Sequence, residues 1–349
     1  MPTPLQYVYT ADSGSTSVSA YRINPDGSLS SVPGSPFAAP YSAQPPNPVV
    51  IKSAGSSLAL GGPPLVPYSV DAANGTIQRT DLITPGPLDL AVDGTGTFVY
   101  QVGRNACQAG ACSDVELFRL ASGKYQFTGA LQPTEGGSGP YSGAPLNPIK
   151  IVLDPTGSFV YVAAIPASGP TSGMEFRVIS RALGSITPRD RDLCPDLNGM
   201  TATADGNRTY IYDSCGPKPA LVQWTVIDNL KGSVLSSGQV EGLGVLEDLV
   251  VDPSGRFLLI ANATQNTVDV YAIEKSTGAL SDRPVQQTAA GIGPKALTFD
   301  ATGQFVYVSN GGCGSSCPAA SNNITSYAFR RGVCNHSVRQ YHRAKILFR

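Results

Sequence analysis

The chain has 349 residues, of which 41% are apolar and 14% charged, with 38 glycines, 29 prolines and a formal net charge of -1. The apolar share can fill a sizeable core in one or two domains, and the many turn residues favour short strands over long amphipathic helices. Six Lys/Arg and no Asp/Glu fall in residues 330–349, so the body is mildly acidic, which argues against nucleic acid as a partner. No apolar run approaches the roughly 20 residues of a membrane-spanning helix, so we expect a soluble chain.

One hairpin pattern recurs along the chain. Its clearest copy, residues 294–310, has an alternating strand, a tight turn closing at Gly303 and a more continuously apolar second strand. Intervals of 41 to 61 residues separate the turn glycines, and a period in this range is typical of propeller blades; these glycines are Gly55, Gly96, Gly157, Gly206, Gly255 and Gly303. Aspartate precedes the glycine by three residues in four copies, where it can cap the turn; these aspartates are Asp93, Asp154, Asp252 and Asp300.

A third strand follows each hairpin, and a turn leads to a fourth, more polar strand. Seven third strands are predicted, at residues 18–23, 65–70, 115–120, 175–179, 221–227, 268–273 and 324–329. Four antiparallel strands per unit make a propeller blade. The fold class predicted is therefore all-β, a seven-bladed β-propeller of four-stranded antiparallel blades.

Residues 1–329 are expected to form this single propeller domain, with blades near 1–45, 46–86, 87–147, 148–193, 194–244, 245–293 and 294–329. Insertions at 104–114 and 133–146 should be loops. The first unit lacks an inner strand, because Tyr7–Thr10 already matches Tyr307–Asn310. The basic tail, 330–349, is either a ring-closing strand, supplied by residues 344–348, or a frayed end.

Six cysteines map to one face of this propeller, since second-to-third loops and blade connections share a face. Three local pairs are predicted as disulfides that staple Gly/Ser-rich loops: Cys107 with Cys112, Cys194 with Cys215, and Cys313 with Cys317. Free buried thiols and a metal site are the alternatives, and the spacings match no zinc pattern. Cys334 is left over in the tail, and one reactive thiol is expected in the native protein.

Disulfides imply a periplasmic or extracellular location. The first six residues lack the basic and apolar regions of a signal peptide, so we expect the precursor to be longer than this chain.

The repeated Pro-x-x-apolar-x-apolar-Asp-x-x-Gly-x-Phe-Val-Tyr-Val pattern, ending in Tyr307-Val308-Ser309-Asn310 and Tyr161-Val162-Ala163-Ala164, resembles the seven-bladed lactonase family. That family includes 6-phosphogluconolactonase-like and carboxymuconate-cyclase-like proteins and overlaps the YVTN-type repeat propellers. Active members of this kind carry Gly-Pro-Arg-His at an inner strand and Asn-Glu after the second strand. The matching positions here read Gly293-Pro294-Lys295-Ala296 and Asn310-Gly311, so the basic residue is kept while the His and Glu are absent.

Lactone hydrolysis needs a group that stabilises the developing oxyanion and a base that activates water. At the channel mouth, Lys295, Lys150, Glu247 and Asp248 are the candidate catalytic residues. Arg104, Asp89 and Asp213 are the candidate substrate-binding residues. The alternative is that these charges only rim a wet channel and pair with one another.

Two functions are therefore compatible with the sequence. The first is a lactonase-like hydrolase, of carboxylic ester hydrolase type, acting on a sugar-acid lactone without cofactor or metal. The second is an exported, non-catalytic propeller that binds a glycan or a protein partner. A monomer is expected in either case, and fold alone does not choose between them.

Overall fold

The computed structural model describes 6–12, 16–39, 50–54, 57–61, 65–81, 89–93, 95, 97–102, 115–121, 124–131, 146–157, 159–166, 174–180, 186–192, 197–205, 208–215, 220–228, 233–241, 243–311, 322–330, 332–336, 341–342 and 346–347. Every regular element in these residues is a β-strand. None of the described residues forms a helix long and apolar enough to cross a membrane.

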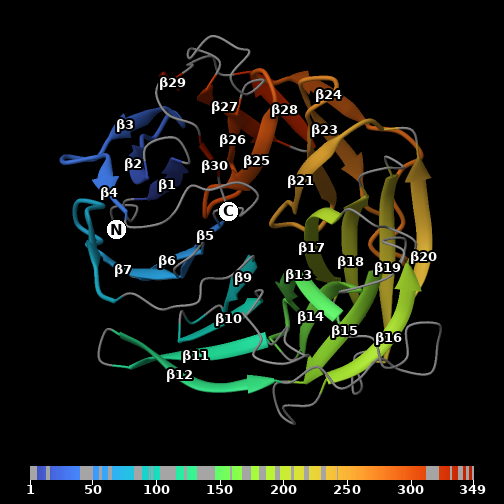
Figure 1. The fold of residues 1–349 in the computed structure, drawn as a ribbon. Coiled ribbons are helices and arrows are strands. Elements are labelled where there is room, and N and C mark those ends of the chain that lie inside the picture. The colour runs from blue at the N-terminus through green and yellow to red at the C-terminus, as the bar shows by residue number, and fades with distance from the viewer. Residues whose placement is uncertain are drawn as a thin grey trace.

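The described strands form seven antiparallel sheets, which stand around a central axis as the blades of a propeller (Figure 1). In five of these sheets the four strands are consecutive in the chain and pair in that order, as expected from the repeated hairpins and third strands. The all-β propeller fold predicted from the sequence is confirmed.

Five sheets contain four consecutive strands each. The second sheet contains β5 (Val50–Ala54), β6 (Ser57–Gly61), β7 (Val66–Val70) and β8 (Ile77–Arg79), and the third contains β9 (Asp89–Val92), β10 (Phe98–Val102), β11 (Val115–Ala121) and β12 (Lys124–Leu131). The fourth contains β13 (Leu146–Leu153), β14 (Phe159–Pro166), β15 (Met174–Ser180) and β16 (Ile186–Asp192), and the fifth contains β17 (Leu197–Asp205), β18 (Arg208–Cys215), β19 (Ala220–Asp228) and β20 (Ser233–Glu241). The sixth contains β21 (Leu246–Val251), β22 (Phe257–Asn262), β23 (Thr267–Ala272) and β24 (Gln286–Ala289).

The first and last sheets have five strands. The first contains β1 (Tyr7–Asp12), β2 (Ser17–Ile23), β3 (Leu29–Ser31), β4 (Phe37–Ala38) and β30 (Ile346–Leu347). The last contains β25 (Pro294–Phe299), β26 (Phe305–Gly311), β27 (Asn322–Arg330), β28 (Val333–His336) and β29 (Tyr341–His342).

The two ends of the chain meet in the first sheet. β30 pairs antiparallel with β1, with Leu347 opposite Ala11 and Ile346 opposite Asp12. It takes the place beside β1 that an inner strand occupies in the other sheets. The basic tail also supplies the fourth strand of the last sheet, because β28 pairs with β27.

The register of β1 differs by two residues from the alignment made on sequence. Val18 and Ile324 begin equivalent third strands; Ala11 lies opposite Val18, and Ser309 lies opposite Ile324. Ala11 therefore matches Ser309. Two residues earlier, Tyr9 and not Tyr7 matches Tyr307. A shift of two residues leaves the inward and outward alternation unchanged, so the hydrophobic pattern cannot detect it.

The aspartates of the repeat are turn residues, as predicted. Asp252 Oδ1 accepts hydrogen bonds from the backbone amides of Arg256 (2.8 Å) and Phe257 (2.7 Å), and its backbone carbonyl accepts one from Gly255 (2.8 Å). Asp300 Oδ1 likewise accepts a hydrogen bond from the backbone amide of Phe305 (2.8 Å). Both aspartates are buried, and their carboxylates are engaged in the hydrogen bonds of their own turns.

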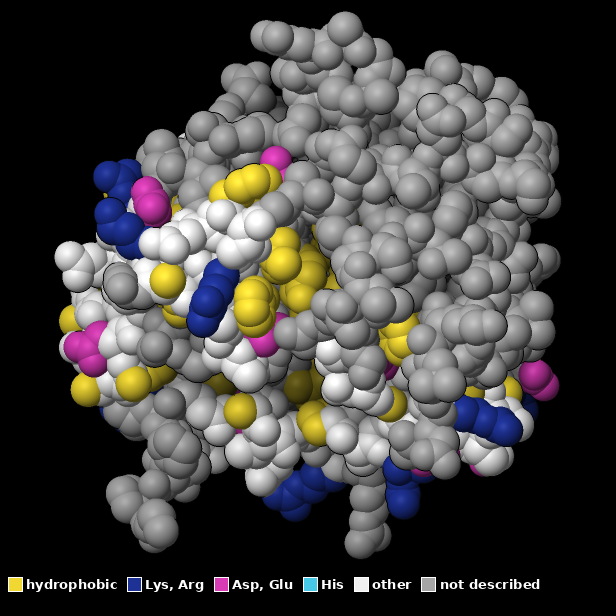
Figure 2. All heavy atoms as spheres, turned by 90° about the horizontal axis from the view of Figure 1, so that it is seen from below, with side chains coloured by type: hydrophobic (Ala, Val, Ile, Leu, Met, Phe, Trp, Pro, Cys, Tyr) yellow, Lys and Arg dark blue, Asp and Glu magenta, His cyan; other side chains and the backbone are white. Residues whose placement is uncertain are grey.

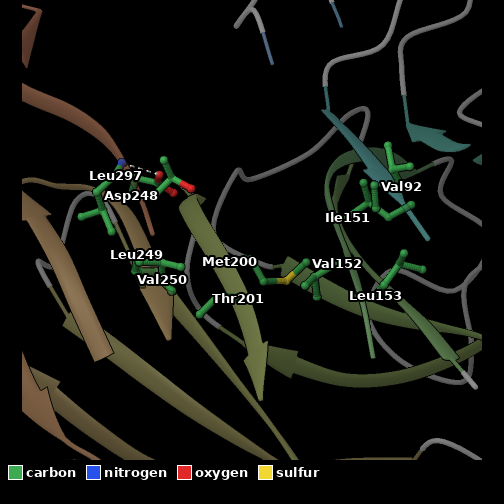
Figure 3. A pocket seen from close by; sticks show the side chains of 12 residues that line it. Val92, Ile151, Val152, Leu153, Met200, Thr201, Asp248, Leu249, Val250 and Leu297 are labelled. Atoms are coloured by element: carbon green, nitrogen blue, oxygen red, sulfur yellow. Dashed lines mark hydrogen bonds between the residues drawn. The ribbon is translucent and has the colours of Figure 1, made fainter. Parts of the chain in front are cut away.

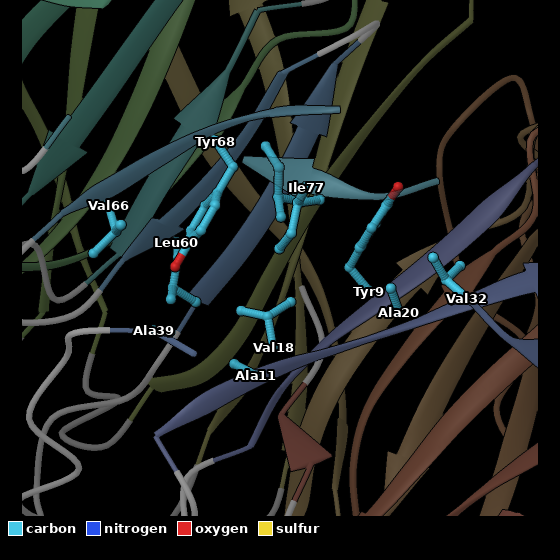
Figure 4. Packing of buried hydrophobic residues seen from close by; sticks show 11 residues of the cluster. Tyr9, Ala11, Val18, Ala20, Val32, Ala39, Leu60, Val66, Tyr68 and Ile77 are labelled. Atoms are coloured by element: carbon cyan, nitrogen blue, oxygen red, sulfur yellow. The ribbon is translucent and has the colours of Figure 1, made fainter. Parts of the chain in front are cut away.

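The hydrophobic core lies between blades rather than in one central mass. In one cluster, Tyr9, Val18 and Val32 of the first sheet pack against Leu60 and Tyr68 of the next (Figure 4). The other described clusters likewise each join two adjacent sheets. Because each cluster needs two blades, a blade cannot bury its faces alone, and the ring folds as a unit.

Tyrosine hydroxyls join neighbouring blades. The hydroxyl of Tyr307 on β26 donates to the carbonyl of Gly27 in the first blade (3.1 Å), and that of Tyr9 donates to Gly75 in the second (3.0 Å). Gly27 has a φ of 78° and lies against the ring of Phe305, so a side chain there would meet both backbone strain and the ring. The contact between the last and first blades thus combines a hydrogen bond, ring packing and strand pairing.

Candidate active site at the inner strand heads

The heads of four inner strands share a β-bulge. In β13, β17, β21 and β25 the pairing register shifts after the first residues, and the residue that is skipped has no partner in the ladder; the skipped residues are Ile149, Asn198, Glu247 and Lys295. Bulges bend the strand and re-aim side chains. These four blades therefore each present one variable side chain at the head of the inner strand.

Two of these bulge residues form an ion pair across the interface between blades. Lys295 Nζ contacts Glu247 Oε1, and the side chains are 37% and 21% exposed. A partly exposed pair contributes at most about 1 kcal/mol to stability. The structure therefore brings two of the predicted catalytic residues together.

Two predicted acidic residues hold neighbouring inner strands together. Asp248 Oδ2 on β21 accepts a hydrogen bond from the amide of Leu297 on β25 (3.2 Å). Asp89 Oδ2 on β9 accepts one from the amide of Ile151 on β13 (3.1 Å). Asp89 and Asp248 are buried and take equivalent places in the two blades. Both carboxylates thus position the inner strands.

The remaining predicted residues are not gathered at this pair. Lys150 is buried on β13, at the place that Asp248 takes in β21. Asp213 is fully buried on the second strand β18, opposite Met200. The β17–β18 hairpin is two residues longer than the β25–β26 hairpin, so Cys215 rather than Asp213 occupies the place of Asn310. Arg104 lies outside the described residues.

The cysteine predictions fall largely outside the described residues: Cys107, Cys112, Cys194, Cys313 and Cys317 are not described, and of Cys215 only the backbone is. Cys334 is a free thiol buried in the core between the last two blades. Burial raises the pKa of the Cys334 thiol to about 12, which disfavours the reactive thiolate, so we expect this residue to react slowly in the native protein. The sequence placed it in a tail, whereas β28 places it in a blade.

A cavity of about 280 Å³ lies between the inner strands, and Figure 3 shows the side chains that line it. Side chains of five inner strands line it, mostly apolar ones, including Ile151, Met200, Val250 and Leu297. Asp248 lies at its edge, where its bond to the Leu297 amide is drawn. Within the described part of the chain, no group of three or more His, Cys, Asp or Glu side chains could hold a metal ion.

Sequence reasoning missed the residues that fix the loop before Lys295. Asn266 has a left-handed φ of 56°, and its Oδ1 accepts a hydrogen bond from the amide of Gly293 (2.7 Å). Asn310 is buried and donates to Asn323 Oδ1 (2.9 Å) and Thr325 Oγ1 (2.8 Å). An asparagine in left-handed conformation gives little sequence signal, because the same residue is common in ordinary turns.

Charge is dispersed over the outer surface. In the view of Figure 2, the described Lys, Arg, Asp and Glu side chains are scattered among polar and apolar ones. The described part of this face therefore shows no concentration of one sign of charge.

Comparison with known proteins agrees with this architecture. Residues 234–329 match the family described as "Lactonase, 7-bladed beta-propeller". No curated protein sequence matches the chain.

Solved structures resemble the whole chain at low sequence identity. A protein from Lactobacillus plantarum is 16% identical with a TM-score of 0.71, over 99% of this chain and 98% of that one. The periplasmic gluconolactonase PpgL of Pseudomonas aeruginosa is 15% identical with a TM-score of 0.70, over 99% and 98%. A 6-phosphogluconolactonase candidate from Bacteroides fragilis is 12% identical with a TM-score of 0.72, over 99% and 97%. The chain thus resembles the lactonase family of seven-bladed β-propellers, in sequence over residues 234–329 and in fold over almost its whole length.

Proposed function

We propose that the protein is a lactone hydrolase whose site lies at the heads of β21 and β25. The observation that carries this proposal is the pairing of Lys295 with Glu247, two bulge residues at the heads of the adjacent inner strands β25 and β21. A cation and a carboxylate held side by side supply the two functions that ester hydrolysis requires.

In the proposed reaction, the carboxylate of Glu247 accepts a proton from water as the water oxygen attacks the lactone carbonyl. The ammonium group of Lys295 stabilises the oxyanion of the tetrahedral intermediate. The intermediate collapses with cleavage of the ring C–O bond, and the proton held by Glu247 passes to the leaving alkoxide. The product is the open hydroxy acid, so atoms and charge balance without a cofactor.

Asp248 is proposed as a positioning residue. Its bond to the amide of Leu297 fixes β25 two residues beyond Lys295. Lys150 remains a proposed catalytic residue, and Asp89, Asp213 and Arg104 remain proposed substrate contacts. The fold relationship to a gluconolactonase and to a 6-phosphogluconolactonase candidate supports a lactone as the substrate class.

The first test is a lactone panel assayed by continuous titration of the acid released, with the spontaneous rate subtracted. Glu247→Gln should lower kcat by a factor of about 100, the lower end of general-base contributions. Lys295→Met should lower kcat to a similar extent, since removing one oxyanion donor costs about 100-fold or more. Lys275→Met is the matched control, because this exposed lysine lies in a turn remote from the inner strands. Wild-type rates equal to the spontaneous rate on every lactone would refute the proposal.

A non-catalytic binding propeller is the second candidate. Ala296 and Gly311 favour it, because they stand where active members of the family carry His and Glu. This candidate predicts that glycan or protein binding survives in Glu247→Gln, and that no lactone is turned over.

For either function we propose an exported monomer with one propeller domain. The periplasmic location of the Pseudomonas aeruginosa gluconolactonase supports export. Size-exclusion chromatography with light scattering tests the oligomeric state, and thiol counting, described below, tests the disulfides.

A further inference from the structure

We infer that the lactone taken by this site is uncharged and carries an apolar substituent, in contrast to a phosphorylated sugar lactone. This inference rests on the proposed function and specifies its substrate class. It is argued from charge, exposed apolar side chains and the cavity at the same place in the fold.

The described segments next to the ion pair offer a phosphate no positive charge besides Lys295, because Lys150 lies on β13, two inner strands away from β21. Lys295 is already neutralised by Glu247. The described segments that surround the pair, residues 243–245, 263–266 and 290–293, contain no charged residue. A phosphate brought here would lose its hydration without gaining a new counter-charge, which is costly.

Two apolar side chains are exposed in the connections that lead to these strands. Val245 is 43% exposed and Ile292 is 45% exposed. They precede Glu247 by two residues and Lys295 by three. The other exposed large apolar residues of the described chain lie on or beside outer strands; they are Phe127, Val285 and Val333.

Hydrogen bonds hold the backbone at Val245 and next to Ile292. The amide of Val245 donates to Thr264 Oγ1 (2.8 Å), and its carbonyl accepts from the amide of Ala263 (2.9 Å). The neighbour of Ile292, Gly293, is held through its amide by Asn266 and through its carbonyl by the amide of Gly311 (2.8 Å). Because the backbone here is already held, binding an apolar group to these exposed side chains needs little ordering of the chain.

The cavity further in combines apolar side chains with polar surface. It begins at Asp248 and Leu297, one and two residues beyond the ion pair, and is lined mainly by apolar side chains. Small-molecule sites commonly combine an apolar lining with a few placed polar groups. We therefore place the lactone ring at the ion pair and its alkyl substituent against Val245 and Ile292.

The test compares kcat/KM for δ-decalactone, glucono-δ-lactone and 6-phosphoglucono-δ-lactone under identical conditions. We expect the alkyl lactone to exceed the phosphorylated lactone at least tenfold, a ratio typical of discrimination by an apolar pocket. The double variant Val245→Ser/Ile292→Ser should lose about tenfold in kcat/KM on δ-decalactone alone. The matched control is Val285→Ser/Val333→Ser, which removes two equally exposed apolar side chains from the outer parts of the same blades.

The outcomes separate the two proposals. Faster turnover of the phosphorylated lactone, or an unchanged Val245→Ser/Ile292→Ser variant, overturns this inference and leaves the hydrolase proposal standing. No turnover of any of the three lactones overturns the hydrolase proposal, and this inference with it.

Discussion

Gly311 leaves the space that the side chain of Lys295 occupies: a Cβ atom added at Gly311 would lie 2.8 Å from Lys295 Cγ. The family pattern places a glutamate at this position, after the second strand. Here the carboxylate beside Lys295 comes instead from Glu247 on the neighbouring blade. The absence of a side chain at residue 311 and the ion pair between blades are therefore parts of one arrangement.

The first prediction concerns this contact. Gly311→Ala should displace Lys295 from Glu247 and lower kcat/KM on the best lactone by about tenfold, the scale of a misplaced catalytic group. Far-ultraviolet circular dichroism should not change. In a Lys295→Met background, Gly311→Ala should have no further effect, because contacting residues are not additive. If the losses of kcat/KM in the two variants add up in the double variant, Gly311 does not act through Lys295.

The second prediction concerns the closing interface of the ring. Gly27→Ala should lower the free energy of unfolding by about 3 kcal/mol or more, because it adds overpacking against Phe305 to backbone strain. Gly34→Ala is the matched control: its φ is 82°, but the nearest ring atom, in Phe37, lies 3.5 Å away. Urea unfolding measures both, and equal losses would contradict the role given to Phe305.

The third prediction concerns the tyrosine bonds between blades. Tyr307→Phe should destabilise the protein by about 1 to 2 kcal/mol, because the buried carbonyl of Gly27 loses its donor. The buried hydroxyl of Tyr271 has no partner among the described residues, so Tyr271→Phe should be neutral or slightly stabilising. Chemical denaturation measures the free energy of unfolding of both variants. A larger loss of stability in Tyr271→Phe than in Tyr307→Phe would refute this assignment.

The fourth prediction concerns alkaline pH. Burial raises the pKa of Tyr68 to about 12 and raises the pKa values of Tyr9, Tyr161 and Tyr212 further above their ordinary 10. Above pH 10 the unfolded chain therefore releases protons that the folded chain keeps, and stability falls as pH rises, by up to about 1.4 kcal/mol per pH unit for each group. Urea midpoints at pH 8 and 11 measure the fall. Tyrosinate absorbance from all 15 tyrosines before any loss of circular dichroism would contradict it.

The fifth prediction concerns the cysteines. If the three predicted disulfides form, the native protein shows no rapidly reacting thiol, because Cys334 is buried and its pKa is raised to about 12. Denaturation without reduction should then reveal one thiol, and reduction should reveal all seven. Seven thiols in the denatured, unreduced protein would refute the disulfides. If the single thiol that denaturation reveals is Cys334, it should be absent in the Cys334→Ala variant.

The sequence by itself determined the repeat, because each blade must alternate buried and exposed residues and must turn at fixed places. The turn aspartates show this directly: Asp252 and Asp300 cap their turns through contacts within a few residues. Local chemistry of this kind is readable from spacing alone. The seven third strands followed from the same regularity.

Only the tertiary structure decided which blades cooperate at the site. Glu247 and Lys295 are 48 residues apart, and their meeting depends on two bulges and on the ring that sets β21 beside β25. The same holds for Cys334, whose burial depends on β28, and for the two-residue register of β1. These features depend on contacts between blades, and a hydrophobic alternation of period two carries no information about which blade a residue faces.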